Sequence, residues 1–274
     1  MSDLYSHWAT VSNRRQSASP QGRGITAALL GPLAPLALEN YSNRHVWDVL
    51  LPKYLTTTGK VLEVGCAPGG YLLKLYKQFG LDPYGVDYEI GGVEETRRNF
   101  QQNGLDPARI LHTDFFAAEF QEKYRASFDI VFSTGFIEHF PDPARVVQLH
   151  ANLLKPGGQL VVMIPALHGL NYLIERVLNV EVLRVHNTEI MTKNTFANLF
   201  SLQPAYCDHY GSFDWHLFYA PRNTWRDSIF RQIDRTQPLV NLLSRLLLRG
   251  TPPTSALRHL LCPGLLFISS PSGA

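Results

Sequence analysis

The sequence has only three cysteines in 274 residues, and they are far apart at Cys66, Cys207 and Cys262. An odd number of cysteines without a CxxC pair argues against a disulfide framework and against a cysteine zinc site, and it indicates a reducing cytoplasm. The histidines also lack an i, i+4 or HxH pair. We therefore expect no metal site.

The chain also lacks a membrane-length apolar run and a strong net charge. The one candidate targeting segment, residues 25–38, is interrupted by Pro32 and Pro35 and has no clear cleavage site, so we do not expect export. The formal net charge is only +2, which gives no reason to expect nucleic acid as a partner.

One segment departs from this even charge. Residues 222–258 contain seven arginines against Asp227 and Asp234, a local balance of +5 that leaves −3 for the rest of the chain. Leucines dominate this segment from 239 to 248. We expect an Arg-rich helical insertion packed on the domain, with peripheral contact to an anionic membrane as the alternative.

Strand-like and helix-like stretches alternate through the middle of the chain. Five β-α units in succession predict a parallel sheet with right-handed crossovers. The segment 155–158, Lys-Pro-Gly-Gly, predicts a stop and a turn before the fifth strand. We expect core strands at 61–64, 83–88, 109–113, 128–133 and 159–164, helices at 43–54, 72–79, 93–103 and 143–154, and two late strands near 206–219 and 265–269.

The regular alternation ends after residue 165. A length of 274 residues fits one α/β domain with elaborations. We expect a polar lead-in over 1–40 and a single domain over 41–274. Within that domain, residues 166–203 are expected to form a helical cap over the site, and 222–258 the insertion.

The most informative stretch runs from Lys60 to Tyr71, where a short strand enters a glycine-rich turn and a helix follows. Gly65 and Gly69 allow the main chain to bend sharply and to approach a ligand closely. The helix directs its free N–H groups into the same turn. Because Asp87 closes the next strand, where a ribose hydroxyl would need an acceptor, the pattern predicts a nucleoside-binding site.

These motifs resemble those of class I S-adenosylmethionine-dependent methyltransferases, most closely the small-molecule branch that includes the ubiquinone-biosynthesis type. The resemblance covers about residues 60–165 and is loose elsewhere. It implies a Rossmann-like, seven-stranded, mostly parallel sheet with a helical cap. The segments that carry it are VLEVGCAPGG (61–70), GVD (85–87), DF (114–115), FDIV (128–131), EHFPDP (138–143) and LKPGG (154–158).

The resemblance also implies that the cofactor is S-adenosyl-L-methionine. Ala67 stands where the family usually has glycine, and the turn tolerates it if its φ is negative. Asp114 is either an adenine contact or a helix cap, and Glu63 orients either the loop or the ligand. The residues expected to contact the cofactor are Glu63, Gly65, Cys66, Ala67, Gly69, Asp87, Tyr88, Asp114, Phe115, Ser133 and Thr134.

His139 is the catalytic candidate, because an imidazole titrates near neutrality and this one would lie beside the transferred methyl. The alternative is a structural histidine that bridges a loop and a helix. Glu138 is the weaker candidate for a base. The histidines in or near the cap are expected at the surface; they are His168, His186, His209 and His216.

We expect methyl transfer to an oxygen of a small metabolite, with carbon or nitrogen less favoured and a lipophilic acceptor left open. Two alternatives remain at this point. An NAD-dependent oxidoreductase is one, because residues 65–70 also fit GxAxxG. The other is a non-catalytic binding or scaffold protein on the same fold.

Overall fold

A seven-stranded mixed sheet forms the centre of the computed structural model, which describes residues 37–55, 58–218, 224–247, 252 and 254–271. The strand order is β3-β2-β1-β4-β5-β7-β6. The first five strands are parallel, whereas β7 runs antiparallel to both β5 and β6. The mostly parallel sheet predicted from the sequence is confirmed. The strands are β1 (Lys60–Val64), β2 (Asp82–Asp87), β3 (Ile110–His112), β4 (Phe128–Thr134), β5 (Leu154–Pro165), β6 (Pro204–Tyr210) and β7 (Gly264–Ser269).

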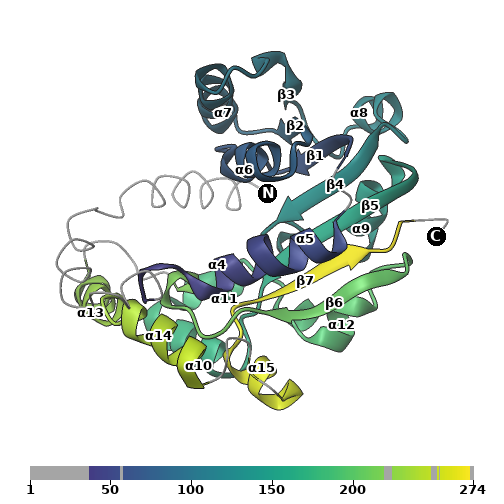
Figure 1. Cartoon of the computed structure of the whole chain (residues 1–274). Helices are drawn as coiled ribbons and strands as arrows, with labels where there is room; N and C mark the ends of the chain where they lie inside the picture. The colour runs from purple at the N-terminus through teal and green to yellow at the C-terminus, as the bar shows by residue number, and fades with distance from the viewer. Residues whose placement is uncertain (1–36, 56–57, 219–223, 248–251, 253, 272–274) are drawn as a thin grey trace.

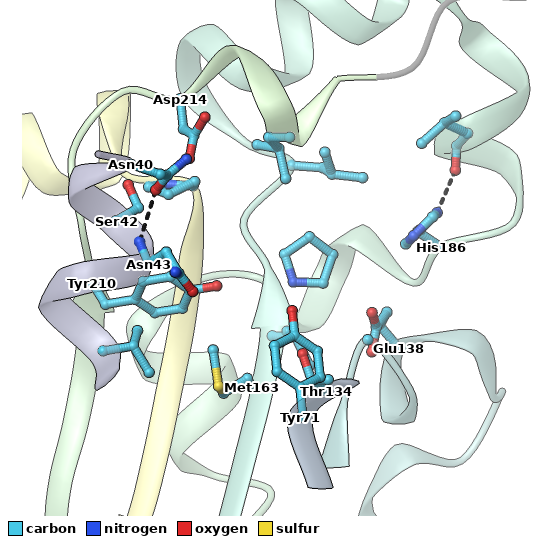
Figure 2. Close-up of a pocket in the computed structure, with 18 of the residues that line it drawn as sticks. Asn40, Ser42, Asn43, Tyr71, Thr134, Glu138, Met163, His186, Tyr210 and Asp214 are labelled. Atoms are coloured by element: carbon cyan, nitrogen blue, oxygen red, sulfur yellow. Dashed lines mark hydrogen bonds between the residues drawn. The ribbon is translucent and has the colours of Figure 1, made fainter. Parts of the chain in front are cut away.

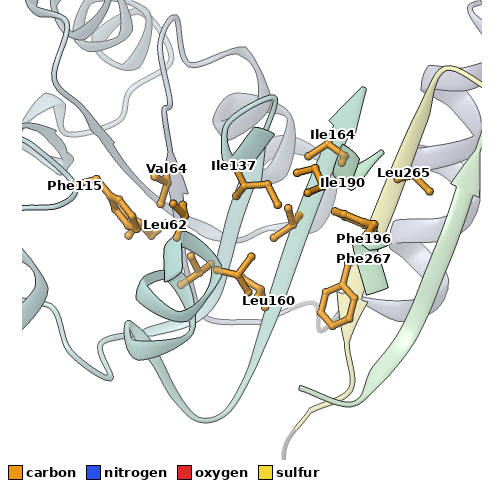
Figure 3. Close-up of a cluster of buried hydrophobic side chains, with 14 of the residues drawn as sticks. Leu62, Val64, Phe115, Ile137, Leu160, Ile164, Ile190, Phe196, Leu265 and Phe267 are labelled. Carbon is orange, nitrogen blue, oxygen red and sulfur yellow. The ribbon is translucent and has the colours of Figure 1, made fainter. Parts of the chain in front are cut away.

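The central strands are apolar on both faces because helices cover both. Successive side chains of a strand point to opposite faces, so Leu160 and Val162 of β5 join one core cluster, and Val161 and Met163 join another. Figure 3 shows the first cluster, in which Phe267 of β7 lies close to Phe196. This two-sided burial explains why the strands read as continuous apolar runs.

The helices between the strands follow the predicted β-α order. The first helical run, expected at 43–54, is continuous but contains a π-helical stretch between two α-helical ends. The elements are α4 (Tyr41–Arg44), η2 (His45–Leu50), α5 (Leu51–Tyr54), α6 (Gly70–Phe79), α7 (Ile90–Gln102), η3 (Pro107–Arg109), α8 (Ala118–Lys123), η4 (Ile137–His139) and α9 (Pro143–Asn152).

The turn expected at residues 155–158 is wrong. These residues belong to β5, which already begins at Leu154 and pairs there with Phe128. The register against β4 shifts between Phe128 and Ile130, so the glycines are accommodated as an irregularity within the strand. Glycine and proline mark a bulge here rather than the end of pairing.

The cap and the insertion are both helical, and no described helix is long and apolar enough to cross a bilayer. The insertion lies between β6 and β7, and Figure 1 shows α10, α14 and α15 gathered at the end of the sheet where β7 begins. The elements are α10 (Gly169–Leu178), α11 (Val180–Arg184), η5 (Thr188–Ile190), α12 (Lys193–Ala197), η6 (Trp215–Leu217), α13 (Trp225–Asp234), α14 (Gln237–Leu247) and α15 (Ser255–Leu261).

Several arginines of the insertion pair with acids of the chain itself. The pairs are Arg245 with Glu39, Arg231 with Asp227, and Arg258 with Asp208, at 3.0, 3.3 and 2.8 Å. Apolar side chains are nevertheless exposed beside them, among them Trp225 and Leu246. Contact of residues 222–258 with a lipid surface therefore stays a prediction. Part of the positive charge of this segment is already neutralised by acids of the chain itself.

Candidate functional site

The turn after β1 has the backbone conformation that its glycines allow. Gly65 and Gly69 have φ of 71° and 87°, and Gly69 is the residue that precedes α6. The amide of Gly65 donates to the carbonyl of Val86 at 2.9 Å, which ties the turn to β2. A Cβ on Gly69 would come within 2.6 Å of Thr96, whereas a Cβ on Gly70 would meet no described neighbour within 4 Å. The turn is thus packed on one side and open where α6 begins, as a ligand-binding turn requires.

Ala67 is accommodated as expected. Among the described non-glycine residues only Ala126 has positive φ, so Ala67 lies in an ordinary region. Its methyl group faces Gly92 of α7, where an added Cβ would lie 2.5 Å from Cβ of Ala67. The methyl that departs from the family pattern is therefore offset by a missing side chain on the neighbouring helix.

Asp87 closes β2 directly beside this turn. Its Oδ2 accepts from the amide of Ala67 at 3.1 Å, and its Oδ1 accepts from the amide of Glu89 at 3.0 Å. Burial raises the pKa of the carboxyl, and the two amides partly offset that rise. The carboxylate is thus held in one orientation at the carboxyl end of a parallel strand, the position that suits a ribose contact.

The other candidates near the turn differ in exposure. Glu63 and Cys66 are buried, and burial together with the nearby acids holds the pKa of the Cys66 thiol well above its usual range. That thiol packs against Gly85, where a Cβ would lie 2.5 Å from Sγ. Tyr88 is partly exposed, and its carbonyl lies 3.0 Å from Nε2 of His112. Direct cofactor contact by these residues stays a prediction.

Asp114 and Phe115 follow β3 on the same edge of the sheet. Asp114 is exposed, and its Oδ1 accepts from the amide of Phe116 at 2.9 Å; the residue that precedes α8 is instead Ala117. Phe115 is buried and packs against His150, with ring centroids 4.8 Å apart. An adenine contact by Asp114 therefore stays a prediction, while the ring of Phe115 belongs to the core.

A cavity of about 240 Å³ opens at the carboxyl ends of β4 and β5. Thr134 lies at its base beside Met163, and the neighbouring Ser133 is fully buried (Figure 2). The ring of Tyr71, at the start of α6, stacks on Trp47 at 5.6 Å. The cavity walls come from α4 and η2, from the cap and from the segment after β6; they include Asn40, Asn43, Trp47, Tyr71, Thr134, Glu138, His139, Leu167, Val182, His186, Tyr210, Asp214 and Leu217.

Glu138, His139 and His186 form a titratable group on one wall of the cavity. The carbonyls of Val185 and Val182 can only accept hydrogen bonds, so Nδ1 carries the proton in both imidazoles, at 2.9 Å in His139 and 2.6 Å in His186. Nε2 of His139 lies 3.7 Å from Oε1 of Glu138. The cap thus fixes the tautomer of both histidines beside a buried carboxyl. Figure 2 shows His186 and Glu138 on the same side of the cavity.

The Glu138 carboxyl is expected to make folding stability depend on pH. Complete burial raises its pKa from 4.5 to about 8. Between these values the folded protein keeps a proton that the unfolded chain releases, so the free energy of unfolding falls as the pH rises, by up to about 1.4 kcal/mol per pH unit. Glu138→Gln should remove this contribution and be the more stable protein at pH 8, as measured by urea denaturation from pH 5 to pH 8.

The exposed Glu94 of α7 offers a matched control. Glu94→Gln should reproduce the slope of the unsubstituted protein, because this side chain is exposed to solvent rather than buried. An unchanged slope in Glu138→Gln would contradict a neutral buried carboxyl.

Two of the cap-region histidines expected at the surface are buried. His209 is 2% exposed and His168 is 9% exposed, with their Nε2 atoms 3.2 Å apart. The surface expectation failed because β6 and the start of α10, distant in sequence, pack together. His186 lines the cavity, and the side chain of His216 lies outside the described residues.

Several cavity residues were missed by sequence reasoning. Asn40 and Asp214 hydrogen-bond at 2.6 Å although 174 residues separate them, and Figure 2 shows both across the cavity from Glu138. Neither belongs to a motif. Trp47 gave only the signal of an apolar helix face, so nothing in the sequence distinguished a cavity wall from core packing.

Comparison with known proteins identifies a family. A family model described as "Methyltransferase domain" matches residues 39–203, more than half of the chain. Curated relatives include ubiquinone biosynthesis O-methyltransferases from Stutzerimonas stutzeri (33% identical over 40% of this chain and 46% of the relative) and Saccharophagus degradans (35% identical over 37% and 41%). The matched part is less than half the length of these relatives.

Solved structures share the fold over most of the chain. A geranyl diphosphate C-methyltransferase from Streptomyces coelicolor A3(2), crystallised with S-adenosyl-L-homocysteine, is 13% identical with a TM-score of 0.52, covering 81% of this chain and 77% of its own. A putative sarcosine dimethylglycine methyltransferase from Galdieria sulphuraria is 16% identical with a TM-score of 0.52, covering 84% and 83%. At these identities the likeness concerns the fold alone.

Proposed function

The chain belongs to the methyltransferase-domain family of S-adenosylmethionine-dependent enzymes, and from that premise we propose that it methylates an oxygen of a small acceptor bound in the cavity. The family match decides between the cofactors that the glycine turn left open. An NAD-dependent oxidoreductase and a non-catalytic scaffold are both set aside, because the chain is a methyltransferase.

The observation that carries the proposal is the titratable group on the cavity wall. A volume of about 240 Å³ lies below the range of drug-sized sites, which favours a single-ring acceptor over a macromolecule. Apolar walls from Trp47, Leu167 and Val182 suit such a ring, and they support a lipophilic acceptor. The names of the curated relatives favour oxygen as the methylated atom.

The residues of the chain divide the work between two regions. The glycine turn and Asp87 would hold the nucleoside part of S-adenosylmethionine, whose sulfonium supplies an electrophilic methyl group. Thr134, at the end of β4, lines the cavity, and β4 pairs with β1, the strand that leads into the glycine turn. Transfer in line then needs the acceptor oxygen held close to the methyl, with water excluded by the cap.

His139 is the proposed base. With its proton on Nδ1, the neutral imidazole keeps its lone pair on Nε2, which is buried beside Glu138, so the side chain must shift for that lone pair to reach a hydroxyl in the cavity. Glu138, kept neutral by burial, would leave the imidazole uncharged and ready to accept that proton. The same wall of the cavity therefore carries both the proposed base, His139, and the Glu138 carboxyl, whose raised pKa makes stability depend on pH.

Turnover with labelled S-adenosylmethionine tests the proposal. The protein is incubated with single-ring phenols and, separately, with a cell extract, and the methylated product is identified by mass spectrometry. We expect label in an O-methyl ether of a small acceptor. Label recovered only in protein or nucleic acid, or on carbon or nitrogen, would overturn the proposed acceptor class.

A further inference from the structure

Three histidines from separate parts of the chain meet outside the cavity. His168 precedes α10, His209 lies on β6 and His259 lies on α15, three elements that are neighbours in Figure 1. A ring nitrogen of each lies within 4.8 Å of a ring nitrogen of the others. The proposed methyl transfer uses none of them.

Two of the three ligands are already spaced for a metal ion. Nε2 of His168 and Nε2 of His209 are 3.2 Å apart. Zinc–nitrogen bonds are about 2.0–2.1 Å long, so an ion bonded to both atoms would subtend an angle of about 100°, near the tetrahedral value. Both side chains are at least nine-tenths buried, which limits their freedom to move apart.

The surroundings orient one of the imidazoles. Nδ1 of His209 lies 3.4 Å from Oδ1 of Asp208, the arrangement of a carboxylate that orients a ligating histidine from behind. Asp208 in turn binds both Lys193 and Arg258, so its carboxylate balances one of these two nearby positive charges.

The third histidine needs a change of side-chain orientation. The rings of His168 and His259 are stacked at 3.9 Å with an angle of 8° between their planes. Parallel rings cannot both direct a lone pair at one ion, so the His259 ring must turn. It is exposed at the surface of α15, so this rotation is open to it.

We infer that His168, His209 and His259 bind a divalent late transition-metal ion, for which Zn²⁺ is the probe, with water as the fourth ligand. Imidazole is a ligand that zinc, copper and nickel share. The ion would join the start of α10, β6 and α15. The first and last of these segments are already linked by a hydrogen bond from Asn171 to the carbonyl of Cys262, two residues that are 91 positions apart in the sequence.

The inferred site lies directly behind the acceptor cavity. Leu167 and Tyr210, which line the cavity, are the sequence neighbours of His168 and His209. Bound metal would therefore fix two cavity walls relative to each other. Its role in this inference is structural, and it rests on the histidine geometry rather than on the proposed reaction.

The test is zinc binding by the EDTA-treated, full-length protein, followed by isothermal titration calorimetry and native mass spectrometry. We expect His259→Gln and His168→Gln each to remove one zinc equivalent or to weaken its binding by at least about a hundredfold. His259→Cys should retain it, because a thiolate also binds zinc. Zinc should also raise the thermal unfolding midpoint of the unsubstituted protein but not of His259→Gln.

The control is His112→Gln, which removes an exposed imidazole at the opposite edge of the sheet. This variant should bind zinc like the unsubstituted protein. Equal stoichiometry and affinity in His259→Gln would overturn the inference, and so would an equal loss in His112→Gln. If zinc were bound instead by the other cluster, Glu138 with His139 and His186, then His259→Gln would bind zinc with unchanged stoichiometry and affinity.

Discussion

Replacing Asp87 with alanine is expected to raise the dissociation constant for S-adenosylmethionine by roughly a hundredfold. The carboxylate is held at the end of β2 by the amides of Ala67 and Glu89, beside the turn that α6 follows. A hydrogen bond to a charged group contributes about 1.5–3 kcal/mol. Two such bonds to a ribose would account for about 3 kcal/mol or more, which is a factor of roughly 100.

Calorimetric titration with S-adenosylmethionine measures this effect, and a thermal melt shows whether the variant stays folded. Asp82→Ala is the matched control, because Asp82 begins the same strand at the end remote from the turn and pairs with Arg109. That variant should bind the cofactor normally. If Asp87→Ala binds as the unsubstituted protein does, the site assignment is wrong.

The fold could be predicted from the sequence because its signals are local. The alternating runs place β1 to β5 in order, and the turn at Gly65 and Gly69 lies at the point where the first strand meets its helix. Asp87 follows from the same logic, since β1 and β2 are parallel and in register beside each other. Strand ends and turn glycines can be recognised from the local sequence without knowing how distant segments pack.

Contacts between segments that are distant in the sequence could not be recognised from such local signals. Asn40 and Asp214 meet on one side of the cavity, and His168 meets His209 and His259, because β6, β7 and the insertion fold back against the cap. Spacing rules for metal ligands examine neighbours in sequence, so they missed a cluster assembled from three elements. The irregularity in β5 was missed for another reason: glycine and proline predict a turn and a bulge equally well.

The contact between Ala67 and Gly92 combines a feature that the sequence reveals with one that only the structure reveals. Sequence reasoning identified the unusual alanine and stated the condition under which the turn would tolerate it. The structure meets that condition and adds a reason that one position alone could not supply, namely a glycine on α7 where a Cβ would lie 2.5 Å away. A departure from a motif is thus best judged together with the residue that it contacts.

Replacing His139 with asparagine is expected to lower kcat by about 10²–10⁴-fold, the usual contribution of a general base. The asparagine amide can donate to the carbonyl of Val185 from nearly the position of Nδ1, so the contact with the cap is kept while the proton acceptor is lost. Cofactor affinity should not change, because His139 lies on the cavity wall rather than at the glycine turn.

His186→Asn is the matched control for this variant. His186 has the same bonding pattern through Nδ1, to Val182, and its ring centroid lies 4.4 Å from that of His139. If His139 is the base, the His186 variant should lose far less activity, and only the His139 variant should lose the acidic limb of the pH–rate profile. Similar losses in both variants with an unchanged profile would assign His139 a structural role, because a side chain that only bridges η4 and the cap affects rate without affecting proton transfer.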